Sequence, residues 1–395
     1  MVKILGGTEK IYNKALLTGG LAHFMHDGVT DMLYVFFPIW QAQFSLTFTE
    51  IGFLKTLFSG TMAGFQVPSS YLACRIGGVR LLVLGTVLTS VSLFLYGWAP
   101  TLVVLGCLLI AGGLGSSVQH PLSSSLISNA YPDNDARRVA LSTFNVAGDI
   151  GKLLLPAGAS LIISRYSWQA ASQVMGIVGI GIAILLFINS KNIIYQNARP
   201  ESAKRASKSM VWKASKGFWA LLIIGMIDSS TRMGFLTFFP FVLQDNGAVV
   251  TTIGLALSLI FAGGAMGKFV CGLLATKVGV LRSVIITEIL TSLCILGMLS
   301  FSLHVEIMLS LLLGVALNGT SSVLYGSVPE LVPEGNRQQA FAIFYTATIA
   351  SGAFSPWLYG AASDIIGIKA SVVLIALVVL FVIPLTIPIK RNLVW

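Results

Sequence analysis

Long apolar stretches separated by short polar segments repeat along almost the whole chain. A helix that crosses a bilayer needs about 20 mostly apolar residues, and windows of about 19 residues identify such helices. The pattern predicts an all-α polytopic membrane protein with 12 transmembrane helices. The expected spans lie near residues 15–43, 49–74, 79–98, 101–127, 138–163, 168–189, 217–244, 250–276, 281–302, 305–329, 338–363 and 369–389.

The second half of this pattern repeats the first. Pro38 matches Pro240, and several neighbouring pairs keep the same offset of 202 positions. We therefore expect two pseudo-symmetric six-helix bundles, over residues 1–189 and 217–395, joined by a polar linker over residues 190–216. A parallel repeat implies a pseudo-two-fold axis along the membrane normal, with a substrate path between the halves.

Composition supports a membrane protein and excludes several other classes. Only 10% of the residues are charged, against about 25% in a typical soluble domain. The net charge of +10 does not indicate nucleic-acid binding, because the basic residues lie in short segments between apolar runs. The four cysteines have no CxxC spacing, which predicts neither a disulfide framework nor a zinc site.

The Lys and Arg residues predict the orientation in the membrane. Nineteen of them fall at the two chain ends, in the linker and in the loops on the same side, whereas only Arg165 and Lys369 fall on the other side. Short loops rich in Lys and Arg stay in the cytoplasm. We expect an integral protein of the plasma (inner) membrane with both termini and the linker in the cytoplasm.

Four ionisable side chains interrupt the first apolar stretch near its middle: His23, His26, Asp27 and Asp31. A charge at bilayer depth costs at least about 2.5–3.5 kcal/mol, so it faces the protein interior or a water-filled path. Asp27 is four residues from both His23 and Asp31, which puts all three on one helix face. Two close carboxylates cannot easily both ionise. The group is either a buried network or a proton site, and we interpret Asp27 as the proton carrier, with Asp31 and His23 next.

Charged residues at depth also occur in the fifth, seventh and eighth spans. Asp149 and Lys152 are spaced i,i+3, and Asp228 and Arg232 are spaced i,i+4, so each pair can neutralise itself locally. Asp228 is a further proton-site candidate. Lys152, Arg232 and Lys268 could instead present positive charge to an anionic substrate.

The remaining polar positions are less easily interpreted. His120 follows Gln119 and precedes Pro121, so it is either a hydrogen-bonded histidine beside a proline kink or a substrate contact. Lys55 lies near the outer end of its span and is expected to extend to the membrane surface. Glu288 is the one charged residue at depth outside the spans expected to line a cavity. The substrate-binding candidates are His26, Gln119, His120, Asp149, Lys152, Arg232 and Lys268.

The loop after the second span carries a family motif. Residues 69–82 (SSYLACRIGGVRLL) resemble the Gly-x-Leu-Ala-Asp-Arg-x-Gly-x-x-x-Arg signature of the major facilitator superfamily, and residues 271–282 are its counterpart in the second half. Cys74 and Thr276 stand where the signature has Asp, which implies a weaker or differently built cytoplasmic latch. Within the superfamily the chain is most similar to the fosmidomycin-resistance type of drug exporter, through residues 23–27, 43–52 and 113–125.

The resemblance implies the major facilitator fold and proton-coupled secondary active transport. The leading interpretation is efflux of a small organic solute by proton antiport with alternating access. The basic residues at depth are compatible with an anionic solute. Residues 148–158 resemble a Gly- and Pro-rich antiporter motif, although Leu155 replaces a Gly. Uptake by proton symport is an alternative. So is transport of a metal ion or chelate, because imidazole and carboxylate groups of the first span and His120 can bind transition metals.

We expect no enzyme activity, because the chain has no HExxH, GxSxG or Walker A sequence. We also expect no cofactor and no resident metal. The expected partners are a small-molecule substrate, protons and the lipid bilayer, with the chain acting as a monomer.

The predicted orientation can be tested by cysteine labelling in a variant that lacks the native cysteines. A membrane-impermeant maleimide added to intact cells should label a cysteine placed at Asp245 and spare one placed at Lys208. Labelling at position 208 in intact cells would contradict the orientation inferred from Lys and Arg.

Overall fold

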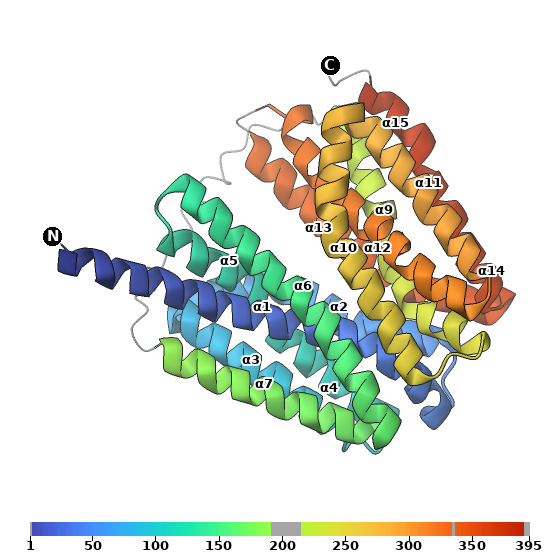
Figure 1. Cartoon of the computed structure of the whole chain (residues 1–395), viewed down its shortest axis with the longest axis horizontal. Coiled ribbons are helices and arrows are strands. Elements are labelled where there is room, and N and C mark those ends of the chain that lie inside the picture. Colours follow the sequence, from blue (N-terminus) through green and yellow to red (C-terminus); the bar gives the residue numbers. More distant parts are fainter. Residues whose placement is uncertain (1, 191–214, 334–335, 391–395) are drawn as a thin grey trace. The chain divides into compact units, whose positions relative to one another are not determined.

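The computed structural model describes residues 2–190, 215–333 and 336–390, and all regular structure within them is helical (Figure 1). Each expected span corresponds to one helix or to two consecutive helical segments, so the predicted all-α fold is confirmed. The predicted linker lies almost wholly outside the described residues. The first-half helices are α1 (Val2–Phe44), α2 (Phe48–Ile76), α3 (Gly78–Tyr96), α4 (Leu102–Ser116), α5 (Gln119–Ala130), α6 (Asn134–Arg165) and α7 (Trp168–Ser190). The second-half helices are α9 (Lys216–Asp245), α10 (Val250–Val278), α11 (Val280–Met298), α12 (Leu303–Ser327), η2 (Val328–Leu331), α13 (Arg337–Ile366), α14 (Ile368–Leu380) and α15 (Val382–Lys390).

Prolines explain why two predicted spans are each divided. The fourth span breaks between α4, which ends at Ser116, and α5, which begins at Gln119, and Pro121 lies in the first turn of α5. Proline has no N–H to donate, but first-turn N–H groups have no helical acceptor in any case. Pro384 likewise cannot bond to the last residue of α14, where the final span divides. The first break places His120 at the beginning of a helix.

Nine helical segments in the described part of the chain are long and apolar enough to cross a membrane by composition alone. The long helices α1, α2 and α13 are not among these nine. In α1 the reason is visible in the sequence, because the four ionisable residues of its middle lower the hydropathy. Helices of this kind need partners inside the protein for their polar side chains.

Contacts between helices group the chain into two compact units. The first comprises Met1–Phe36 and Leu57–Arg199, and the second comprises Phe37–Thr56 and Pro200–Trp395. In the first unit α3 packs against α4, α5 and α7, and α6 packs against α5 and α7. In the second, α9 packs against α13, α14 and α15, while α12 packs against α10 and α11. The end of α1 and the start of α2 therefore belong to the second unit. The division at residues 189 and 217 stays a prediction.

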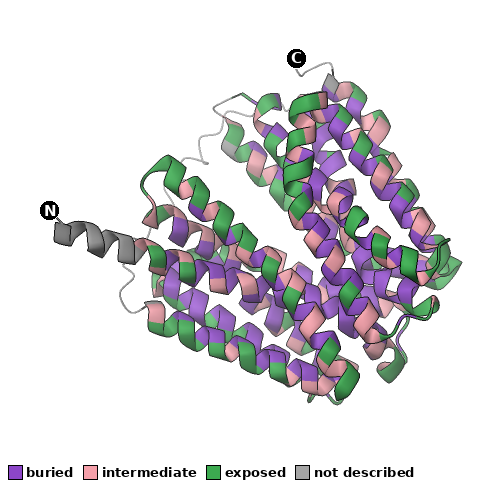
Figure 2. Cartoon of the chain, viewed as in Figure 1, coloured by how far each residue is buried: buried purple, intermediate pink, exposed green. Residues whose placement is uncertain are grey.

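Large apolar side chains are exposed on helices of both units. Val103, Phe269 and Ile365 expose 75%, 74% and 83% of their surface, as do many other aliphatic residues to a lesser degree. Figure 2 shows buried and exposed residues side by side on many of the helices. Soluble monomers rarely expose large apolar patches, whereas a lipid-facing surface must be apolar.

Candidate functional site

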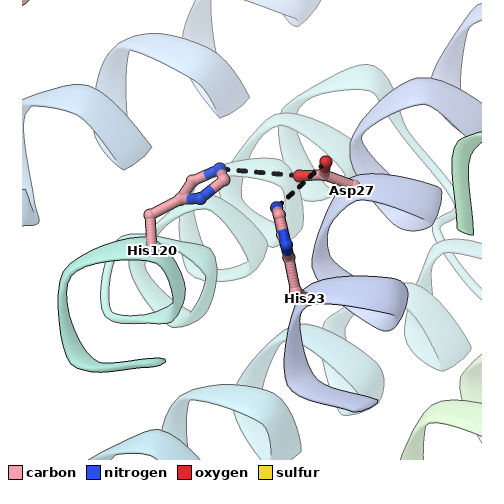
Figure 3. A group of neighbouring side chains, drawn as sticks. All are labelled: His23, Asp27 and His120. Carbon is pink, nitrogen blue, oxygen red and sulfur yellow. Dashed lines mark ion pairs between the residues drawn. The ribbon is translucent and has the colours of Figure 1, made fainter. Parts of the chain in front are cut away.

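Four basic side chains surround the carboxylate of Asp27 inside the first unit. The Nε2 atom of His23 and the Nζ atom of Lys152 each lie 3.2 Å from Oδ2 of Asp27. The Nε2 atom of His120 lies 3.5 Å from Oδ1 (Figure 3), and that of His26 lies 3.8 Å from the same oxygen. Asp27 is only 7% exposed. A buried carboxylate needs such partners, and this cluster supplies them from three different helices.

Helix α1 presents His23 and Asp27 one turn apart, and α6 approaches this face through glycines. A Cβ atom at Gly151 would lie 2.0 Å from the carbonyl oxygen of Phe24, so the two backbones are in direct contact. A Cβ atom at Gly148 would lie 2.7 Å from both Oδ2 of Asp27 and Nε2 of His23. Only glycine allows α6 this close, and the approach is what lets Lys152 reach a carboxylate on α1.

One hydrogen bond determines which nitrogen of His23 can take a proton. The Nδ1 atom lies 2.9 Å from the backbone oxygen of Phe144, in a buried contact. A carbonyl oxygen only accepts, so Nδ1 must carry a hydrogen and donate it. The other nitrogen, Nε2, then bears the free lone pair that faces Asp27.

The acids around Lys152 extend this cluster. Nζ of Lys152 lies 4.0 Å from Oδ2 of Asp31, and Asp149 also acts on Lys152 electrostatically. A local pair between Asp149 and Lys152, which the sequence left open, stays a prediction, and the structure adds ion pairs from Lys152 across to α1. Lys152 therefore joins α6 to two acids of α1.

Gln119 is the neighbour of His120 in sequence but has a different environment. Its Nε2 atom donates to Oγ1 of Thr86 at 2.8 Å, a buried bond between α5 and α3. This contact turns Gln119 toward α3, whereas His120 turns toward α1. Gln119 as a substrate contact stays a prediction.

A second buried polar group lies in the other unit, around Asp228. The side chains of Asp228 on α9 and Glu288 on α11 share a hydrogen bond and are 4% and 2% exposed. Arg232 acts electrostatically on both, and its Nη1 atom donates to Oγ of Ser321 at 3.3 Å. Sequence reasoning set Glu288 aside as an exception, although a lone Glu in an apolar span was a signal that it needs a partner.

Lys55 differs from what the sequence predicted, whereas the anion-binding role of Lys268 stays a prediction. Lys55 was expected to extend to the membrane surface, but it is only 1% exposed. The side chain of Lys55 is buried because the first turns of α2 pack within the second unit. Lys268, a candidate for binding an anion, lies on an exposed part of α10.

His23, Asp27 and His120 could also hold a metal ion. Each offers one ligand atom, and the three atoms lie within 4.8 Å of one another (Figure 3). Two imidazoles and a carboxylate suit a transition metal. However, the ammonium group of Lys152 lies 3.2 Å from the same carboxylate and repels a second cation.

A family model described as the Major Facilitator Superfamily matches residues 19–227 and 221–392. The chain belongs to this superfamily. The fold agrees with the structure of a bacterial homologue of the human lysosomal transporter Spinster, in its inward-facing and occupied conformation. The TM-score is 0.79 at 16% identity, over 95% of this chain and 96% of that one. The predicted major facilitator fold is thus confirmed, and the protein is a membrane transporter.

The sequence identity to individual transporters lies between 21% and 30% for three relatives. The chain is 25% identical to the uncharacterized transporter YfnC of Bacillus subtilis, over 91% of this chain and 89% of that protein. It is 30% identical to the fosmidomycin resistance protein of Escherichia coli, over 40% of each chain. It is 21% identical to a probable sulfoacetate transporter, SauU of Cupriavidus necator, over 61% of this chain and 59% of that one. The match to a fosmidomycin resistance protein agrees with the resemblance found in the sequence.

The close approach at Gly148 yields a prediction about stability. Gly148→Ala should destabilise the protein by about 1–3 kcal/mol, because the added methyl overpacks the contact between His23 and Asp27. An exposed Gly→Ala change in a helix is instead stabilising by up to about 1 kcal/mol. Gly181 is the matched control, since a Cβ there meets no atom within 4 Å. Thermal unfolding in detergent measures both, and equal melting temperatures for the two variants would rule out the tight contact.

Proposed function

We propose that this superfamily member is a proton-coupled secondary active transporter that exports a small organic solute by proton antiport with alternating access. The observation that carries the proposal is the buried cluster of one carboxylate with three imidazoles and one ammonium group. Intramembrane clusters of Asp and His act as proton relays in pumps and transporters. Imidazole is the group whose ordinary pKa lies nearest to physiological pH.

A count of charges supports one exchangeable proton in this cluster. With Asp27 and Asp31 ionised and Lys152 protonated, these three residues together carry one negative charge. One proton on a neighbouring imidazole, such as Nε2 of His23, neutralises them. Buried charges are costly unless paired, so the protonated and deprotonated clusters should favour different conformations. Asp27 touches all four bases and is the centre of this exchange. Asp228, with Glu288, is a second candidate for proton binding.

The substrate is proposed to be a small organic anion. Sulfoacetate, which the name of one relative mentions, is an anion. Lys152, Arg232 and Lys268 supply positive charge within the predicted spans. The similarity to a fosmidomycin resistance protein favours export. The protein would act as a monomer in the plasma (inner) membrane, with both termini in the cytoplasm.

Two other kinds of transport use the same residues. Uptake by proton symport needs the same proton site, and the sign of proton movement distinguishes it from antiport. A metal ion as cargo is favoured only by the ligand set of His23, Asp27 and His120. Binding of Co²⁺ to the purified protein, lost in His120→Ala, would favour that second candidate.

Asp27→Asn tests the proposal, because it keeps the size and hydrogen bonding of the side chain but removes the negative charge that favours a proton on the neighbouring imidazoles. Proteoliposomes with an internal pH dye would be given a panel of anionic, cationic and neutral compounds that includes fosmidomycin and sulfoacetate. The wild-type protein should move protons with at least one compound. The variant should lose at least about 99% of that proton movement, since a positioned proton-transfer group contributes about 10²- to 10⁴-fold. It should still exchange labelled solute between the two sides.

Asp135→Asn is the matched control, because Asp135 is an exposed acid of α6 that pairs with Arg138. This control should retain proton-driven transport. A stable Asp27→Asn protein with normal pH dependence of transport would contradict the proposal. The proton site would then be sought at Asp31 or Asp228.

A further inference from the structure

Helix α2 begins with a capping box formed by its own residues. The backbone N–H of Thr47 donates to Oε2 of Glu50 at 2.8 Å, and the backbone N–H of Glu50 donates to the hydroxyl of Thr47 at 3.2 Å. A capping box satisfies two of the N–H groups at a helix start. It leaves the N–H groups of the two residues between them, Phe48 and Thr49, without an acceptor from within α2.

Both of these N–H groups donate to one carboxylate from the far end of the sequence. Oδ1 of Asp364 accepts from the N–H of Phe48 at 2.8 Å, and Oδ2 accepts from the N–H of Thr49 at 2.9 Å. The hydroxyl of Thr49 donates to the same Oδ2 at 2.5 Å. Asp364 lies in the last turn of α13, so a side chain of α13 completes the N-terminal cap of α2. The positive end of the α2 dipole also attracts the carboxylate.

Close packing continues the contact along both helices, within the second compact unit. A Cβ atom at Gly52 would lie 2.0 Å from the backbone oxygen of Pro356, and one at Gly360 would lie 2.3 Å from the backbone oxygen of Phe48. Further along, the hydroxyl of Thr56 donates to the backbone oxygen of Ala353 at 2.9 Å. The two helices thus touch backbone to backbone over about two turns of α2.

The first turn of α2 is held by both apolar packing and hydrogen bonds. The ring of Phe48 packs edge-on against Phe238 and Phe241 of α9, with centroids 6.0 Å and 5.3 Å apart. These apolar contacts are non-directional and tolerate sliding. The hydrogen bonds of Asp364 are directional and charge-assisted, and they are lost once the helix ends separate by more than about 1 Å.

We propose that Asp364 is a latch that holds the start of α2 on α13 and so keeps the outer side of the transporter closed. The distribution of Lys and Arg puts the α1–α2 loop and the end of α13 on the outer side. The segment over residues 37–56 groups with α13 in the second unit, although α1 and α2 continue from it into the first unit. In the latch model, access from outside requires the start of α2 to leave α13. The inference rests on the alternating-access part of the proposed function and is independent of proton coupling.

The latch should be insensitive to pH in the physiological range. Partial burial alone would raise the pKa of Asp364, but the hydrogen bonds from the Thr49 hydroxyl and from the Thr49 and Phe48 N–H groups outweigh burial and lower this pKa below its usual value. The stabilisation is therefore complete above the ordinary pKa of an aspartate, about 3.9, and is lost as pH falls through the lowered pKa. The other carboxylate at this helix start, Glu50, faces Thr47.

The test measures access from outside to a position beneath the contact. Ala353 is 4% exposed, and Ala353→Cys in a background without native cysteines is the reporter. Intact cells are treated with a membrane-impermeant maleimide at pH 7. Adding Asp364→Ala should raise the labelling rate about tenfold, within the roughly 2- to 30-fold that loss of a helix cap provides. Asp364→Asn, which keeps one acceptor oxygen, should give a smaller rise.

Two further variants keep the test decisive. Asp245 is an exposed acid at the end of α9, and Asp245→Ala should leave the rate unchanged. If Asp364→Ala does not fold, Thr49→Val still removes one donor to the carboxylate and should raise the rate roughly two- to fivefold. An unchanged rate in the folded Asp364 and Thr49 variants, or an equal rise in Asp245→Ala, would overturn the latch. The assay uses neither a substrate nor a pH gradient, so failure of proton coupling cannot mimic this result.

Discussion

A carboxylate in the middle of an apolar helix is the constraint on which the first unit of this transporter depends. Asp27 cannot be left unpaired inside lipid or protein, and the neighbouring turns of its own helix offer only imidazoles. A permanent cation must come from elsewhere, and Lys152 brings it from α6. The break between α4 and α5 then adds His120. The polar cluster thus requires three helices to meet at one point.

Glycine makes both of the helix contacts on which the two proposals rest. At Gly148 and Gly151, α6 comes close enough to α1 for its lysine to reach Asp27. At Gly52 and Gly360, α2 and α13 touch through their backbones, which places Asp364 on the first turn of α2. Helices in lipid gain little from the hydrophobic effect when they associate, so close van der Waals contact and hydrogen bonds decide where they meet. The same small residues allow helices to slide and separate.

The two halves repeat in sequence but differ in chemistry. His26 and Asp228 are 202 positions apart and occupy matched places in the repeat. The first half surrounds one acid with imidazoles and a lysine, whereas the second pairs two acids, Asp228 and Glu288, under the influence of Arg232. Imidazoles exchange protons readily near neutral pH, and a guanidinium does not lose its proton in proteins. This contrast is the reason to place the main proton exchange in the first half.

The sequence alone determined everything that depends on positions along one helix. Apolar length predicted the spans, and the spacing of His23 and Asp27 predicted a shared face, because an α-helix has a fixed period of 3.6 residues. Tertiary structure decided what depends on which helices meet and how each is rotated. It joined Lys152 to Asp27, directed Gln119 to Thr86, paired Glu288 with Asp228 and brought Asp364 to a helix that begins 316 residues earlier. No local period encodes those distances, because they arise from side-chain packing between helices far apart in the chain.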